Sequence, residues 1–162
     1  MTEVTEKRSL QTQGEAVKAL SLYEQDIVLW VEDTVAKLKA GDFANVDLVN
    51  LIEEVESVGV SQRRELFSRL NRLLEHLLKR LYVNSPEHFN GWEQTIRHQR
   101  VELIKLLETS PSLKTQWEKN CEEAWKSALK TVRKAYKNHS FPDRFPYPSD
   151  VESMLDRDYW EE

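Results

Sequence analysis

The sequence predicts an all-α protein: a single-domain bundle of about five helices with a C-terminal arm rich in proline and aromatic residues. Apolar residues recur at helical spacing along most of the 162 residues, and glycine and proline number only 4 and 5. Charged residues make up 31% and hydrophobic residues 40% of the chain, which is typical of a helical globule with charged outer faces. We therefore expect one domain, residues 21–162, preceded by a mobile lead-in over residues 1–20.

The first helix is expected to run from Ser21 to Gly41. Ser21 and Glu24 have the spacing of a capping box, in which each side chain binds a free backbone N–H group of the first turn. Gly41 fits the glycine position that commonly ends a helix. The apolar face of this helix consists of Tyr23, Ile27, Trp30, Val31, Thr34, Val35 and Leu38.

Two helices are predicted between Asp47 and Tyr82, separated by Gly59. Asp47 is a suitable N-cap for the first, which is acidic, and Ser61 begins the second, which is basic. The second has the longest apolar stripe in the chain and should be the central helix of the bundle. Its stripe comprises Leu66, Leu70, Leu73, Leu74, Leu77, Leu78 and Leu81.

Two more helices and an arm complete the prediction. A loop, VNSPEHFN, precedes a helix that begins at Asn90 or Gly91. Ser110 and Pro111 mark the start of another helix, which continues to about Asn138. The segment FPDRFPYPSD suits an extended arm whose rings dock on the bundle, and a short helix follows it.

The tryptophans and the single cysteine provide a test of this packing. We expect Cys121, which has no Cys or His nearby at ligand spacing, to be a small core residue. Trp160 should be exposed or docked at an edge. Four tryptophans should be largely buried: Trp30, Trp92, Trp117 and Trp125.

The net charge of −5 conceals a strong segregation of charge along the chain. Residues 21–60 hold nine acidic residues against two lysines, whereas residues 61–82 hold six basic residues against two acidic ones. The simplest interpretation is that acidic and basic helices pair within the bundle; the alternative is a basic surface for nucleic acid. No apolar run approaches the length of a membrane span and the N-terminus lacks the apolar core of a signal peptide, so we expect a cytoplasmic protein without a membrane partner.

Few residues suggest chemistry. The usual motifs for phosphate binding, nucleophilic catalysis and zinc binding are absent from the sequence, and we expect no metal and no cofactor. His76 lies close to Arg72, Lys79 and Arg80 along one helix, so it should remain neutral, with Glu53 or Glu56 as its hydrogen-bond acceptor.

An alternative is a metal-independent ribonuclease that uses an arginine followed by a histidine. Arg69 with His76 has this spacing, and so does Arg133 with His139.

Several polar side chains lie beside the apolar stripes and are expected to form one cluster. Asp26 and Arg100 interrupt such stripes, and because an unpaired buried charge is unfavourable we expect these two to meet in the bundle interior. The predicted cluster consists of Asp26, Glu53, Glu56, His76, Lys79 and Arg100.

A set of short motifs occurs in order over residues 20–160. They are Tyr23, Asp26 and Trp30; Asp47 followed by LVNLIEEVESVG; Arg63, Arg64 and Glu65; HLLK from His76 to Lys79; Trp92, Thr95, Ile96 and Arg100; SPSL from Ser110; and Phe141, Pro142, Pro146 and Tyr147. Together they resemble a bacterial family, abundant in cyanobacteria, that is catalogued as domain of unknown function twenty-nine.

The resemblance implies an all-helical fold, a bacterial cytoplasmic setting and no agreed activity. It supplies no catalytic residue, although its polar pattern positions include Glu54 and most of the predicted cluster. The chain departs from the family at Arg80, where an aromatic residue usually follows HLLK. We therefore expect a non-enzymatic protein-interaction module, with self-association through exposed apolar surface left open. The alternative is a nucleic-acid-binding protein or ribonuclease.

Overall fold

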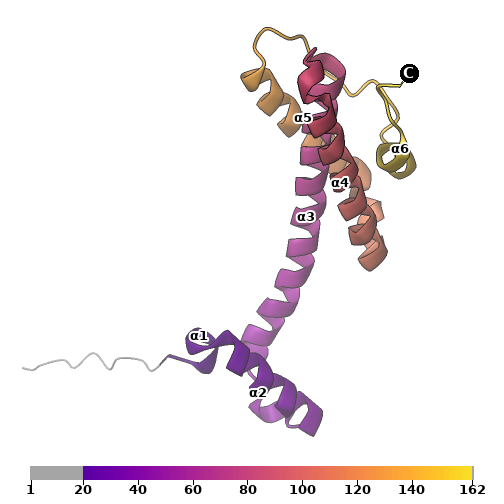
Figure 1. Cartoon of the computed structure of the whole chain (residues 1–162). Helices are drawn as coiled ribbons and strands as arrows, with labels where there is room; N and C mark the ends of the chain where they lie inside the picture. The colour runs from indigo at the N-terminus through magenta and orange to yellow at the C-terminus, as the bar shows by residue number, and fades with distance from the viewer. Residues whose placement is uncertain (1–19, 162) are drawn as a thin grey trace, which may run out of the picture. The chain divides into compact units, whose positions relative to one another are not determined.

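A computed structural model describes residues 20–161 of the chain (Figure 1), and the expected lead-in lies outside them except for Leu20. The prediction of an all-α fold is confirmed: these residues form α-helices and short 3-10 helices and no strand. The chain divides into two compact units, Met1–Ile52 and Glu53–Glu162, called here the N-terminal and C-terminal units. None of the described helices combines the length and apolar character needed to cross a membrane.

The N-terminal unit begins with two helices where one was expected. α1 (Leu22–Gln25) carries the predicted capping box, with Ser21 and Glu24 binding each other's backbone N–H groups. Asp26 then adopts an extended conformation and caps α2 (Ile27–Ala40). Gly41 ends α2 with φ 74, a left-handed conformation that favours glycine.

Trp30 and Asp47 hold the rest of the N-terminal unit together. The ring of Trp30 packs edge-on against Tyr23, at 5.0 Å between centroids, and its Nε1–H donates to Asp47 Oδ2 at 3.2 Å. Asp47 follows the 3-10 helix η1 (Phe43–Asn45) and, as predicted, caps the next helix by accepting from the Asn50 backbone N–H. Among residues 20–52, the described part of this unit, the buried residues are few: Trp30, Thr34 and Val46.

α3 (Leu48–Tyr82) is one continuous helix of 35 residues, so the predicted break at Gly59 is wrong. A glycine within a helix costs only about 1 kcal/mol relative to alanine. The apolar spacing also continues in phase through Gly59, from Val55 to Leu66, and no proline removes a backbone donor. One glycine therefore does not interrupt this helix.

The next helices begin and end at residues other than those expected. α4 (Pro86–Thr109) starts inside the predicted loop because Pro86 occupies the first helical position, where its missing N–H group is not needed. The predicted start at Ser110 and Pro111 is a 3-10 helix, η2 (Pro111–Gln116). α5 (Trp117–Ala135) follows and ends three residues before the expected Asn138.

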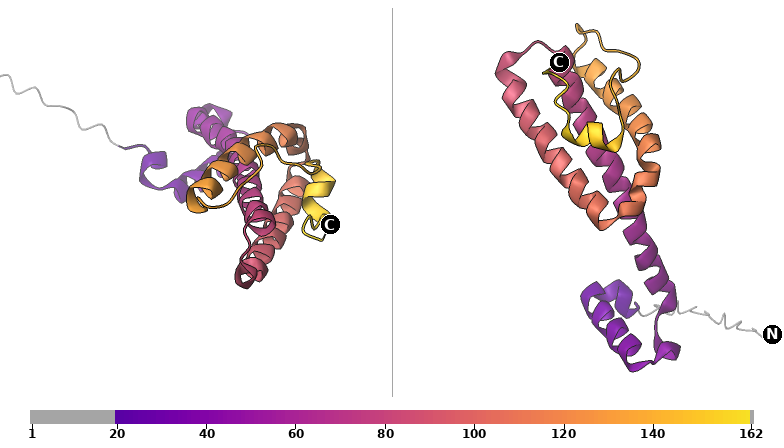
Figure 2. Two further views of the ribbon diagram at one scale, coloured as in Figure 1. Left: turned by 90° about the horizontal axis from the view of Figure 1, so that it is seen from above. Right: turned by 90° about the vertical axis from the view of Figure 1, so that its right-hand side faces the viewer.

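The core of the C-terminal unit forms around the second half of α3, as predicted for the central helix. In the right view of Figure 2 this half lies between α4 and α5, and the C-terminal segment lies over them. Leu66, Leu70, Leu73 and Leu77 have no exposed surface, and they pack with Ile96 and Leu103 of α4 and Ala124 and Ala128 of α5, among others. Burying one leucine side chain stabilises the fold by about 1.5–3 kcal/mol.

The C-terminal arm docks through its rings, as predicted. Phe141 is buried, and Phe145 and Tyr147 are partly buried against the core. The indole N–H groups of Trp117 and Trp125 donate to the backbone oxygens of Ser149 and Asp143, at 2.9 and 3.0 Å. The arm ends in α6 (Val151–Asp156), which is capped by Asp150.

The tryptophan predictions are confirmed except at one position. Trp30, Trp117 and Trp125 are buried, whereas Trp92 is only partly buried. Trp160 docks at an edge of the core, with the Arg80 guanidinium carbon 5.2 Å from its ring centroid.

Candidate functional site

Asp26 and Arg100 do not pair with each other, which corrects the prediction for the polar cluster. Asp26 is exposed, and its Oδ1 accepts from the backbone N–H groups of Val28 and Leu29 at 3.0 and 3.1 Å. The carboxylate thus satisfies the free donors at the start of α2. Its position beside an apolar stripe reflects helix capping rather than a buried ion pair.

Arg100 is buried in the C-terminal unit and binds the last segment of the chain. Its Nη1 donates to Asp158 Oδ1 at 2.8 Å and its Nε to the Met154 backbone oxygen at 3.0 Å, and a further bond reaches the Arg157 backbone oxygen. A buried guanidinium needs acceptors such as these for its N–H groups. Arg100 is therefore a structural anchor that holds α6 against α4.

His76 is buried on α3, but Glu53 and Glu56 are not its hydrogen-bond partners. Its Nδ1 lies 2.9 Å from the Arg72 backbone oxygen and its Nε2 lies 3.1 Å from Lys79 Nζ. Because Nδ1–H donates to the carbonyl, Nε2 is left to accept from the lysine. His76 and Lys79 thus form the part of the predicted cluster that the structure brings together.

The expectation that His76 stays neutral agrees with its environment, although the main cause is different. Burial lowers the pKa of His76 to about 4, opposed by the bond to the Arg72 carbonyl and reinforced by the charges of Lys79 and Arg72. Burial also lowers the pKa of Lys79, although the nearby Glu75 carboxylate partly opposes this. A histidine with so low a pKa is a poor general base or acid at neutral pH.

The arginines proposed for a ribonuclease site already have partners. Arg69 lies 3.2 Å from Glu65 and 3.5 Å from Glu102. Arg133 binds Asp143 at 2.7 Å and the Phe141 backbone oxygen at 2.9 Å. In both cases the guanidinium is engaged within the fold.

Glu53 and Glu56 are exposed on α3 and have no hydrogen-bond or ion-pair partner among residues 20–161. The same is true of Arg63 and Arg64 on the following turns. The two glutamates therefore lie outside the cluster predicted for them. Four charges on consecutive turns of one helix remain available to a partner outside the chain.

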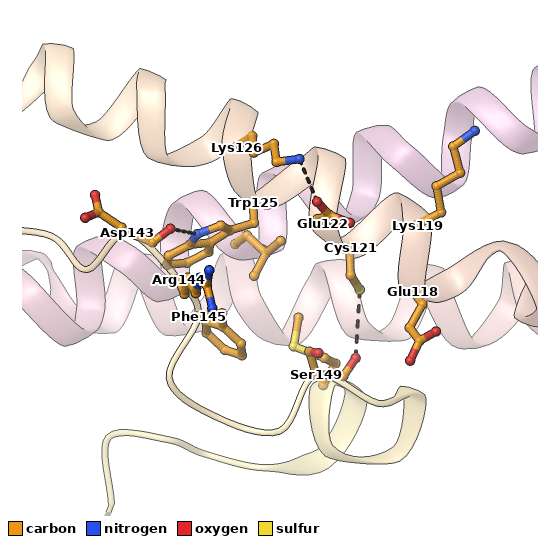
Figure 3. A pocket seen from close by; sticks show the side chains of 12 residues that line it. Glu118, Lys119, Cys121, Glu122, Trp125, Lys126, Asp143, Arg144, Phe145 and Ser149 are labelled. Carbon is orange, nitrogen blue, oxygen red and sulfur yellow. Dashed lines mark hydrogen bonds and ion pairs between the residues drawn. The ribbon is translucent and has the colours of Figure 1, made fainter.

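A groove of about 790 Å³ lies between α5 and the C-terminal arm (Figure 3). Leu74, Trp125, Phe145 and Met154 give it apolar walls, and its rim carries both charge signs, with Lys126 bound to Glu122 at 2.6 Å. This balance of charge favours neither an anion nor a cation.

Cys121 also lines the groove and is buried, as predicted for a small core residue. Burial, reinforced by the carboxylate of Glu118, raises the pKa of its thiol to about 12. The thiol therefore stays protonated and is no activated nucleophile.

Uncovered apolar side chains are the most unusual feature of the described surface; the sequence left exposed apolar surface open as a route to self-association but did not locate it. Fifteen of the seventeen exposed large hydrophobic residues of the described chain lie between residues 20 and 60. Four of them, Ile27, Val31, Val35 and Leu38, had been assigned to the apolar face of the first helix. The helical period identifies the face that needs covering, but it contains no information on what covers it.

Twelve of the fifteen belong to the N-terminal unit, and four of these share one face of α2. Val28, Val31, Val35 and Leu38 follow the alternating spacing of three and four that places side chains in a single seam. The seam is distinct from the inner face, which contains Trp30 and Thr34. We call these four residues the α2 seam.

Comparison with known families yields a match over almost the whole chain. The family model described as "Domain of unknown function DUF29" matches residues 22–160. No curated protein and no solved structure matches the chain.

Proposed function

The chain belongs to the DUF29 family, whose function is unknown, and we propose that it is a cytoplasmic protein-interaction module that binds a partner through the apolar side chains of its N-terminal unit. The C-terminal unit, with its continuous core, would serve as the stable support. The observation that carries the proposal is the α2 seam, four apolar side chains that are each at least 37% exposed.

The energetics of the seam favour a binding role. Fully burying a valine or leucine side chain is worth about 1.5–3 kcal/mol, so covering even part of this seam is a substantial driving force for association. Large apolar patches on a soluble protein commonly mark interaction sites. Apolar side chains at this spacing are the pattern by which one helix binds another.

The N-terminal unit also has too little core of its own. Its buried residues within the described chain are Trp30, Thr34 and Val46. The unit spans Met1–Ile52, and a domain of about 60 residues or fewer is only marginally stable by itself. A partner that covers the α2 seam would supply the missing apolar contact.

Charge indicates the kind of partner. Residues 21–52 contain six acidic residues and two lysines, and Lys37 is already paired with Asp33. An acidic surface around an apolar seam favours a partner whose apolar surface is bordered by lysine or arginine. It disfavours nucleic acid as the occupant, because phosphates would be repelled.

The test compares two matched double variants. Val31→Asp with Val35→Asp introduces two charges into the α2 seam, and Val101→Asp with Ile104→Asp does the same on the exposed face of α4. Proteins captured by the wild type from host lysate would be identified, purified and titrated against all three proteins by calorimetry. We expect the α2 variant to lose binding by at least about tenfold and the α4 variant to retain it.

Two results would contradict the proposal. Equal binding by the wild type and the α2 variant would place the interaction elsewhere. Metal-independent cleavage of RNA by the purified wild type, abolished by His76→Ala in a folded protein, would favour the ribonuclease alternative instead.

A further inference from the structure

Gly59 has no evident purpose within the chain. It lies in the middle of α3 in a right-handed helical conformation, so no backbone requirement selects glycine there. A Cβ at this position would meet only the guanidinium of Arg63, at 3.5 and 3.9 Å, which is ordinary contact with a flexible side chain. Alanine would fit and would favour the helix more strongly. A bare backbone on an exposed helix allows another backbone to approach closely.

The side chains around Gly59 form an uncovered apolar surface in the C-terminal unit. Val55 and Val58 are 65% and 61% exposed, and Val60 is also exposed. Val55 lies one turn before Gly59, and Leu66, which is fully buried, lies two turns after it on the same face. The apolar stripe that is buried from Leu66 onward thus continues toward the start of α3, through Gly59, where it is exposed.

The unpartnered charges of this segment are acidic before Gly59 and basic after it. Glu56 and Glu53 precede it by three and six residues, and Arg63 and Arg64 follow it by four and five. Glu56 and Arg63 lie on the same flank of the seam. In an antiparallel pair of identical helices crossing at Gly59, Glu56 of each copy would lie opposite Arg63 of the other. In a parallel pair this flank would face the opposite flank of the other copy, so Glu56 and Arg63 would not meet.

We propose that two copies of this chain associate through α3, antiparallel and crossing at Gly59. The occupant is a second copy because Glu56, Arg63 and the missing side chain of Gly59 belong to the same short segment, so one two-fold axis pairs both charges and brings the two glycines together. The contact is separate from the α2 seam. It would stand even if no other protein binds that seam.

The dimer has a distinct set of expected properties. Close approach of the two helices at Gly59 brings Val55 and Val58 of each copy into contact with the other. The two Glu56 and Arg63 pairs at the rim make association sensitive to salt, because exposed ion pairs are screened. Any side chain larger than hydrogen at position 59 should hold the helices apart.

Sedimentation equilibrium of the full chain tests the proposal, with variants designed for opposite outcomes. Glu56→Arg and Arg63→Glu should each weaken dimerisation by about tenfold or more, whereas the double charge swap should restore it to near the wild-type value. Gly59→Leu should abolish the dimer while circular dichroism shows an intact helical fold. Val31→Asp with Val35→Asp, in the α2 seam, should leave the dimer unchanged.

Three outcomes would overturn the inference. A wild-type chain that stays monomeric up to about 1 mM excludes an association of useful strength. A dimer unaffected by Gly59→Leu, or not rescued by the charge swap, uses another surface. If the α2 variant abolishes the dimer, the dimer contact lies in the N-terminal unit. The monomeric result leaves the proposed binding of another protein intact, because that binding is measured separately against the α2 variant.

Discussion

The two halves of α3 carry the same apolar stripe, but the stripe is buried in the second half and exposed in the first. In the second half Leu66, Leu70 and Leu73 have no exposed surface, whereas in the first half Ile52 and Val55 are 56% and 65% exposed. Helical periodicity is equally clear in both. An amphipathic helix therefore shows that a face needs a partner, and only the surrounding chain decides whether the partner is internal.

Truncating one apolar residue in each half of α3 should give the largest difference in the free energy of unfolding. Leu70→Ala removes buried methyl groups from the core and should lower the free energy of unfolding by about 3–5 kcal/mol. Val55→Ala removes exposed ones and should change it by no more than about 0.5 kcal/mol at a protein concentration where the chain is monomeric. Urea denaturation measures both values. Similar losses at the two positions would mean that the first half is covered as well.

Two charged residues sharpen the contrast between the units. Arg100→Ala in the C-terminal unit leaves Asp158 and two backbone oxygens without their donor, so we expect a loss of about 2–3 kcal/mol. Asp26→Ala in the N-terminal unit removes only a helix cap and should cost about 1 kcal/mol. The same denaturation experiment ranks them, and a larger effect at Asp26 would contradict its assignment as a cap.

Acid should weaken the covered half of α3 through His76. Its pKa is about 4 in the folded protein and about 6.5 when unfolded, so the unfolded chain binds more protons between these values. Stability is therefore complete above about pH 6.5 and falls by about 3 kcal/mol as the pH drops to 4. His76→Gln should flatten this slope relative to the wild type, and His98→Gln, at an exposed position of α4, is the matched control. An unchanged slope in His76→Gln would show that the imidazole is accessible to water.

A gain in stability, rather than a loss, is expected at Gly59. Gly59→Ala should stabilise the monomer by about 1 kcal/mol, because alanine favours the helix and meets no close contact within the chain. Thermal unfolding at low protein concentration, followed by circular dichroism, would detect the gain. A loss of stability would mean that the glycine serves a need within the chain after all.

Much of the fold followed from local patterns, but little of the candidate site did. The capping box at Ser21, the terminal glycine Gly41, the leucine stripe of α3 and the docking of the arm's rings were all predicted. Asp26 was expected to be a buried ion-pair partner because it interrupts an apolar stripe, although its distance from Val28 and Leu29 already matched an N-cap. Gly59 was expected to end or bend a helix because the free-energy cost of a helical glycine was judged without the apolar stripe that continues through it.

Local order in this protein is encoded within a few residues, because caps and helical turns involve groups no more than about four positions apart. The helical class and several helix ends are therefore legible from the amino acids alone. Arg100 meets Asp158 across 58 residues of chain, and no local pattern names that partner. The path of the chain likewise decides which stripe is covered: the second half of α3 received α4, α5 and the arm, and its first half was left open. Burial depends on what folds against a face, and that information lies elsewhere in the chain or in another molecule.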